Sequence, residues 1–330
     1  MAVKTETKSS LITWLSNLSQ EQRSVIIAYS MIILLIIFGS LAISPQFASP
    51  DFLLLQLLKA SILGIVATGQ MIVILTGNID LSVSWTLNLS AVLLTSIVLG
   101  QNNELGKGLA AALSVGVVVG LLNGLGVAYL RVPSMVLTLG MNALVKGVTV
   151  FYTGAQPKGD APSILNFVVH YRLGGGLSMA VIIWIIIAVI SIIVLHRSTL
   201  GRKIYAVGNN EIATYLSGAK TNFVLISVFV IAGVMYSLAG VLLTGYAGRS
   251  YNEMGDPLLL PSIAAVVVGG ASILGGSGLY LGTIAGVIIV TLLESVLSLL
   301  QIPQFGRNIV FGVVILAMLF FYGRGSKVRE

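Results

Sequence analysis

Residues 52–100 read FLLLQLLKASILGIVATGQMIVILTGNIDLSVSWTLNLSAVLLTSIVLG. The stretch holds two apolar runs, at about 52–76 and 81–100, each close to the ~20 residues that a helix needs to cross a bilayer. Between the runs, Thr76 to Ser82 bring in polar groups and a glycine. Irregular backbone is tolerated at membrane depth only where protein or a wet cavity covers it. The stretch therefore predicts an interrupted membrane helix beside a transport path.

A second interruption lies in the other half of the chain, where residues 269–278 read GGASILGGSG between two apolar runs. Glycine also recurs within the runs, and Gly116, Gly120 and Gly124 are spaced every four residues. Small residues at this spacing leave one helix face nearly bare and let two helices approach closely in lipid. We expect tight helix packing at this face rather than a transport role.

The composition excludes a soluble protein. Hydrophobic residues make up 56% of the 330 residues and charged residues only 9%, against about 25% charged in soluble domains. The mean hydropathy is +1.01. The sequence predicts an all-α, polytopic transmembrane bundle of about ten spans with interrupted helices, and counts from eight to eleven fit the uncertain boundaries. The apolar runs lie at roughly 25–43, 52–76, 81–100, 107–128, 134–153, 177–196, 222–246, 257–275, 279–301 and 306–322.

The distribution of basic residues predicts the orientation. With the N-terminus inside, eleven Lys and Arg fall in cytoplasmic segments, five in external segments and two within apolar runs, as the positive-inside rule requires. Both termini are then cytoplasmic, as tails over 1–24 and 323–330 that flank a membrane domain over 25–322. The net charge of +7 is spread along the chain, so basic loops explain it better than nucleic-acid binding.

The sequence offers little for catalysis. Cysteine is absent and the two histidines lie far apart, so we expect no metal site and no cofactor. We find no paired acids and no nucleophile with a base, and therefore expect no enzyme. Residues 100–108 superficially resemble a phosphate loop, but the spacing is one residue too long and no Ser or Thr follows the lysine. Any ATP hydrolysis must occur on another chain.

Asp80 is the most informative charge, because a carboxylate deep in hydrocarbon costs about 2.5–3.5 kcal/mol and should face a cavity or a partner. If a helix begins near Leu81, Ser84 and Asn88 share a face, and with Trp85 they suit a sugar. Capping of that helix by Asp80 is an equally good interpretation. Glu294, also within an apolar run, is expected to make an interhelical hydrogen bond. The candidate path residues are Asn78, Asp80, Ser82, Ser84, Trp85 and Asn88.

Residues 197–221 form the longest cytoplasmic connection in this topology. Asn209 or Asn210 can cap a short helix, Glu211 suits its first turn and Gly218 can close it. Ile212, Tyr215, Leu216 and Ala219 then share one face, and so short a helix should dock onto something. It is either an ordinary interfacial helix or a docking element for a cytoplasmic partner. The candidate coupling residues are Gly208, Asn209, Asn210, Glu211, Ala213 and Gly218.

Four segments in order resemble ribose-type ABC importer permeases, over about residues 50–320. They are Met71–Val83, Gly147–Gly154, Leu200–Gly218, and Ser262–Gly270 with Leu274–Gly278. The resemblance implies a bacterial inner-membrane permease dimer, formed with a second copy or a homologue, that binds two ATPase domains and receives solute from a periplasmic binding protein. It also implies that residues 208–218 contact the ATPase. The chain departs from the family pattern at Trp85, Pro261 and Ser277. These departures bear on the identity of the substrate more than on membership of the family.

The leading hypothesis is import of a small polar solute, a monosaccharide, by alternating access driven by a separate ATPase. External stretches at 154–176 and 247–257 would meet the binding protein. The alternative is an ion-coupled secondary transporter that uses Asp80 and Glu294 as coupling groups. The sequence does not identify the solute.

Overall fold

Ten apolar helices account for the ten apolar runs. The computed structural model describes residues 20–156 and 159–325, so most of the predicted N-terminal tail, Lys158 and the last five residues lie outside the described residues. The ten helices are α2 (Gln20–Ala42), α3 (Pro50–Leu75), α4 (Val83–Val98), α5 (Leu105–Ala128), α6 (Ser134–Thr153), α8 (Met179–Arg197), α11 (Thr221–Ala247), α12 (Asp256–Val268), α13 (Tyr280–Leu299) and α14 (Gln304–Gly325).

Short elements connect these helices. They are the helices α7 (Ser163–His170), α9 (Thr199–Asn209) and α10 (Glu211–Leu216), and the 3-10 turns η1 (Pro45–Ala48), η2 (Asn102–Glu104) and η3 (Leu173–Gly175). Two isolated β-bridges, Asp160 with Arg249 and Arg172 with Ser178, join the loops. Every named element in the described ranges is helical, which confirms the predicted all-α class.

Seven described helices are long and apolar enough to cross a membrane: α2, α3, α5, α6, α8, α11 and α13. The other apolar helices, α4, α12 and the described apolar part of α14, are shorter. Two of the short ones adjoin the predicted interruptions, since α4 follows the break after α3 and α12 precedes the break before α13. The polytopic bundle is confirmed, and the number of ten spans stays a prediction.

The glycine face of α5 packs directly on the backbone of α11. A Cβ on Gly120 would lie 2.7 Å from the Cα of Val230, and a Cβ on Gly124 would lie 2.7 Å from the Cα of Ile226. Gly116 faces Gly233 in the same way. Real Cβ atoms essentially never approach within 3.0 Å, so no larger residue fits here without a shift. The expected tight packing is confirmed.

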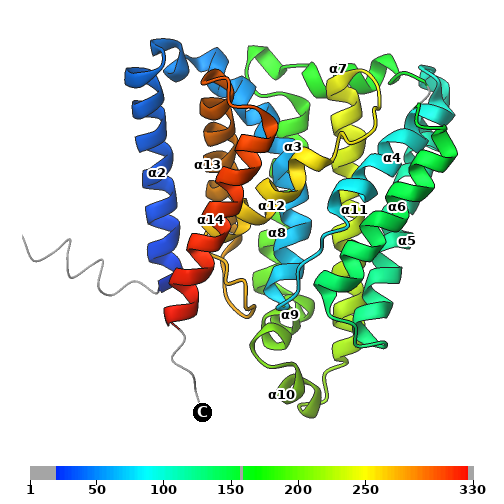
Figure 1. Ribbon diagram of the computed structural model, residues 1–330, viewed down its shortest axis with the longest axis vertical. Coiled ribbons are helices and arrows are strands. Elements are labelled where there is room, and N and C mark those ends of the chain that lie inside the picture. Colours follow the sequence, from blue (N-terminus) through cyan, green and yellow to red (C-terminus); the bar gives the residue numbers. More distant parts are fainter. Residues whose placement is uncertain (1–19, 157–158, 326–330) are drawn as a thin grey trace, which may run out of the picture.

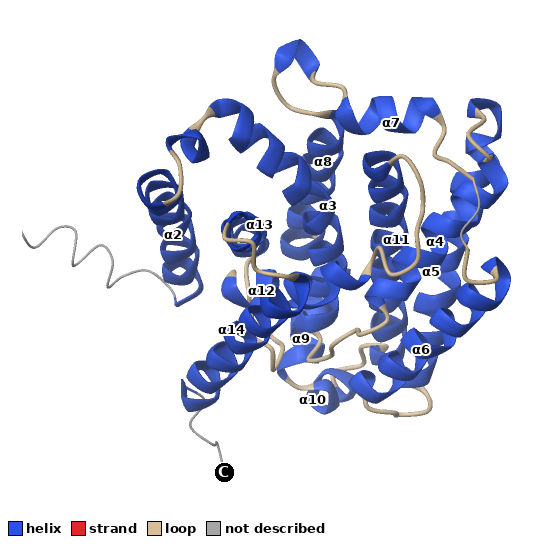
Figure 2. Cartoon of the chain, turned by 45° about the horizontal axis from the view of Figure 1, so that its top comes forward, coloured by secondary structure: helices blue, strands red, loops and turns tan. Residues whose placement is uncertain are grey.

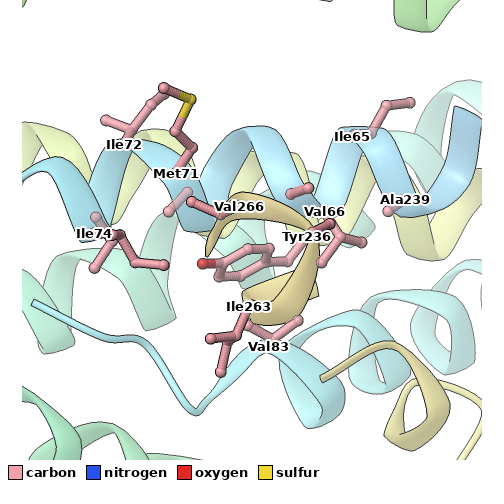
Figure 3. Packing of buried hydrophobic residues seen from close by; sticks show 14 of the residues in the cluster. Ile65, Val66, Met71, Ile72, Ile74, Val83, Tyr236, Ala239, Ile263 and Val266 are labelled. Carbon is pink, nitrogen blue, oxygen red and sulfur yellow. The ribbon is translucent and has the colours of Figure 1, made fainter. Parts of the chain in front are cut away.

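Helix α3 forms the centre of the bundle. Of its most apolar window 89% is buried, against 11% for α2, which lies at the edge (Figure 2). The Tyr236 ring of α11 packs among Ile74 of α3, Val83 of α4 and Val266 of α12 (Figure 3). Its hydroxyl donates to Gln70 Oε1 at 2.9 Å, so one buried aromatic joins helices from both halves of the chain.

The two ends of the bundle differ. Helix α10, the first turn of α2 and the last turn of α14 lie at one end, which we call the α10 end (Figure 1). Turn η1 and α7 lie at the opposite α7 end (Figure 1). The predicted topology requires this grouping of the two chain ends with residues 197–221. The assignment of the α10 end to the cytoplasm stays a prediction.

Candidate functional site

The first break follows Leu75, the last residue of α3, and includes Gly77, whose φ of +76° favours glycine. Two backbone N–H groups of the break are hydrogen-bonded to side chains of α6. Ile79 N donates to Ser134 Oγ at 3.2 Å, and Leu81 N donates to Thr138 Oγ1 at 2.9 Å. Each hydroxyl replaces a lost helical hydrogen bond. Non-helical chain is thus covered by protein, as its depth in an apolar bundle requires.

Asp80 lies in this break and is buried, with 1% exposure. Its Oδ1 accepts hydrogen bonds from Ser82 N at 2.8 Å and from Ser82 Oγ at 2.6 Å. Asn123 of α5 donates in turn to Ser82 Oγ at 2.9 Å. Helix α4 begins at Val83, two residues later than the start considered from sequence. Asp80 therefore stabilises the turn before the helix, and Ser82 occupies the capping position.

The polar face of α4 is buried and bonds to α6 and to the loop before α12, although Asn88 Oδ1 has no hydrogen-bond partner among the described residues. Ser84 Oγ and the Trp85 backbone N–H both donate to Asn142 Oδ1 of α6, at 3.2 and 3.3 Å. Asn88 Nδ2 donates to the Tyr251 carbonyl at 3.3 Å. Ser84, Trp85 and Asn88 are all buried.

Trp85 packs away from this polar face, against α5 and α6. Its apolar neighbours are Val115, Val119 and Val145. The Lys146 ammonium lies 5.0 Å from the ring centroid, a cation–π distance. Asn78 is half-buried, and its amide donates to Thr76 Oγ1 at 3.0 Å. A role of these six residues in the solute path stays a prediction.

The second break, residues 269–279, is a glycine turn between α12 and α13. Gly275 and Gly276 have φ of +90° and +75°, and Ser272 N donates to the Ser277 carbonyl at 3.0 Å. The predicted interruption is therefore confirmed at both places in the chain.

Both breaks meet the end of α9. Gly276 N donates to the Leu75 carbonyl at 3.0 Å, which joins the second break to the last residue of α3. Asn209 Nδ2 donates to the Gly276 carbonyl at 3.1 Å, and Tyr205 Oη donates to the Gly278 carbonyl at 2.7 Å. Three segments far apart in sequence thus share one set of hydrogen bonds.

Glycines make this meeting possible. A Cβ on Gly208 would lie 2.5 Å from Gly276 N and would overlap the Leu75 carbonyl. A Cβ on Gly275 would lie 2.6 Å from Gly77 N. We call Gly77, Gly208, Gly275 and Gly276 the glycine junction. Periodicity indicates helices and breaks but not which breaks touch, so the sequence did not reveal this contact.

Helix α10 projects from the α10 end beside α9 (Figure 1). Asn210 caps it, accepting from Ala213 N at 2.9 Å, and Gly218 closes it with φ of +86°, as predicted. Ile212, Tyr215 and Leu216 are 74%, 65% and 77% exposed. Large apolar side chains this exposed on one short helix mark an interaction surface. We call these three residues the α10 patch.

Glu211 links α10 to the rest of the molecule. Its Oε1 accepts from Arg131 Nη1 at 2.5 Å, and Arg131 lies in the turn between α5 and α6 with φ of +55°. Beside α10, a recess of about 390 Å³ between α9 and α10 is lined by exposed Arg202 and Lys203. The surface around the α10 patch therefore has a basic side.

Residues 52–322 match a family model described as "Branched-chain amino acid transport system / permease component". The chain belongs to this permease family. The permease is 36% identical over 299 residues to the ribose import permease protein RbsC of Escherichia coli (strain K12), covering 90% of this chain and 91% of RbsC. It is 35% identical over 285 residues to the autoinducer 2 import system permease protein LsrC of Salmonella choleraesuis (strain SC-B67), covering 86% and 81%.

These matches confirm the resemblance to ribose-type ABC importer permeases. The chain is a multi-pass inner-membrane permease, and the relatives that it matches are transport permeases rather than enzymes. Three partners of the predicted residues and breaks escaped sequence analysis: Tyr205, Asn123 and Asn142. A polar side chain isolated in an apolar run was the available signal for Asn123 and Asn142, because such amides usually bond between helices.

Proposed function

We propose that this permease imports a monosaccharide by alternating access, powered by ATP hydrolysis on a separate subunit that docks on the α10 patch. The observation that carries the proposal is the connection from this exposed patch, through α9, to both helix breaks. A force applied at α10 reaches the glycine junction directly, because Tyr205 and Asn209 of α9 bond to the second break.

The docking partner should match the surface chemistry of the α10 end. Ile212, Tyr215 and Leu216 supply the apolar centre, and Arg202 and Lys203 supply a basic rim. An ATPase with an apolar groove and acidic residues beside it fits this surface. Residues 208–218 are then the coupling loop, with α10 as the part that enters the groove.

A sugar substrate rests on the relatives. One imports ribose by its name and another autoinducer 2, while the family description names branched-chain amino acids. We propose the sugar class because the matched relatives cover nearly the whole chain. The second permease copy and a periplasmic binding protein complete the importer, with the binding protein meeting the loops 154–176 and 247–257 at the α7 end.

Reconstitution tests this proposal. Proteoliposomes that hold the permease with its ATPase and binding protein should take up labelled D-ribose, or another monosaccharide, only when ATP is present. Replacing Ile212 and Leu216 with Asp should abolish co-purification of the ATPase while leaving the melting temperature unchanged, since both side chains are exposed. The matched control is Leu173→Asp, because Leu173 is 55% exposed but lies in η3, outside the apolar runs and far from α10.

An ion-coupled transporter gives the opposite results. Uptake would then survive without ATP, would collapse with an ionophore, and would not depend on the α10 patch. Solute uptake by the purified permease alone on an ion gradient would refute the proposed function.

A further inference from the structure

A charged cavity lies at the α7 end, between α3, α11, α12, α13 and α14. Its volume is about 310 Å³, within the range of small-molecule sites. Lys59, Glu294 and Arg307 line it together with the hydroxyl groups of Thr291 and Ser298. Lys59 and Ser298 are exposed, so the cavity is open in the described chain. None of its lining residues belongs to the path residues that sequence analysis selected.

Arg307 and Lys59 both interact electrostatically with Glu294, but none of these three charges forms a direct ion pair in the described chain. In the described part of the chain, Glu294 forms neither a hydrogen bond nor a salt bridge within 4.0 Å, and Lys59 forms no salt bridge. The expected interhelical hydrogen bond of Glu294 is not formed among the described residues. The Arg307 Nε donates to the Ile302 carbonyl at 2.9 Å, which leaves the end of its guanidinium to the cavity.

Unpaired charges within a membrane bundle are costly, and they mark functional sites when they line a cavity. Here two cations and one carboxylate surround a space that also holds apolar Ile62 and Leu258. The carboxylate can accept two hydroxyl hydrogens, and the cations can donate to hydroxyl oxygens. Apolar side chains suit the C–H faces of a ring. Two cations and one carboxylate leave the cavity with one excess positive charge, which disfavours a cationic solute.

We propose that this cavity is the solute site of the outward-facing permease, and that it takes a monosaccharide, with Glu294, Lys59 and Arg307 as its hydrogen-bonding groups. The inference rests on the proposed function. It places the solute site between α3, α13 and α14 instead of at the polar face of α4. Ser84, Trp85 and Asn88 of α4 are enclosed by protein. The proposed site instead opens at the end opposite α10.

The absence of cysteine from the chain makes the test direct. In right-side-out vesicles that hold the complete importer, Ser298→Cys is labelled with a membrane-impermeant thiol reagent, and the rate is followed by the mass of the permease. We expect labelling from outside that slows at least threefold with saturating D-ribose, D-xylose or D-glucose. The matched control is Asn103→Cys, which is exposed in the turn η2 outside the apolar runs and does not line the cavity, and whose labelling should not respond to sugar.

A second variant tests the chemistry. Glu294→Gln in the Ser298→Cys background should remove sugar protection. It should also raise the labelling rate with an anionic reagent relative to a cationic one by about threefold or more, because a negative charge leaves the cavity. A role limited to helix packing would not change that ratio. Melting temperatures of all variants show that they fold.

Three results would overturn the inference: no labelling of Ser298→Cys from outside, labelling that no sugar slows, or an unchanged reagent ratio in Glu294→Gln. Protection by L-leucine but not by sugars would overturn the monosaccharide class. These outcomes differ from failure of the proposed function, which is measured separately as loss of the ATP requirement for uptake by the wild-type importer.

Discussion

Replacing Gly208 with Ala should uncouple ATP hydrolysis from transport. Gly208 is the point where α9 meets both breaks, and an added Cβ would lie 2.5 Å from Gly276 N, where ordinary contacts begin at 3.4 Å. It would also overlap the Leu75 carbonyl, which accepts the 3.0 Å hydrogen bond from Gly276 N. Both neighbours are backbone atoms, so no flexible side chain can move aside.

The cost follows from two terms. Overpacking by one methyl group in a tight contact costs about 1–3 kcal/mol. Loss of the Gly276–Leu75 hydrogen bond adds about 0.5–1.5 kcal/mol. Together they disfavour the junction by roughly 2–4 kcal/mol, against which the higher helix propensity of Ala returns about 1 kcal/mol. A net penalty of about 1–3 kcal/mol corresponds to a decrease of roughly 5- to 150-fold in the fraction of molecules whose glycine junction keeps these contacts.

The assay measures sugar uptake and ATP hydrolysis in the same proteoliposomes. We expect uptake by Gly208→Ala to fall at least fivefold while ATP hydrolysis and ATPase co-purification persist, because the α10 patch is untouched. Gly140→Ala is the matched control, since Gly140 is also inside a helix but has no atom within 4 Å of an added Cβ. Wild-type uptake per ATP in Gly208→Ala would refute the idea that the junction transmits the motion.

Two further predictions concern stability. Gly120→Val should prevent folding or lower the melting temperature sharply, because its side chain would enter the Phe229 and Val230 backbone, whereas Gly147→Ala, which has open space, should not. A double-mutant cycle on Arg131→Ala and Glu211→Ala should give a coupling free energy below about 1 kcal/mol, because the pair is partly exposed. A coupling free energy well above that would show that this ion pair contributes more than a surface contact.

The helices were predictable because a helix that crosses a bilayer needs a run of about 20 mostly apolar residues. Every one of the ten apolar runs became a helix, and both polar interruptions, at Thr76–Ser82 and 269–278, remained outside helices. A cap at Asn209 or Asn210 was also predictable, since its signal is local, and the structure places it at Asn210. Local patterns of length and polarity determine these features.

Contacts between distant segments were not predictable in this way. The meeting of Leu75, Gly208 and Gly276 depends on how three separate connections fold back, and no periodicity records it. The cavity around Glu294 was missed for the same reason, because its charges come from three different helices. Asp80 attracted attention as a single buried acid, and the structure gives it a hydrogen-bonded turn of its own.

The direct backbone contact of α5 with α11 limits where this permease can change shape. Two helices whose main chains touch at Gly116 and Gly233 would lose this close packing if they slid or separated. We therefore expect α4, α5 and α11 to move as one block, and the proposed alternation to displace other helices, such as α12, α13 and α14, against it. Spin-label distances should stay constant within that block and change across it during turnover, and a change between α5 and α11 would contradict this division.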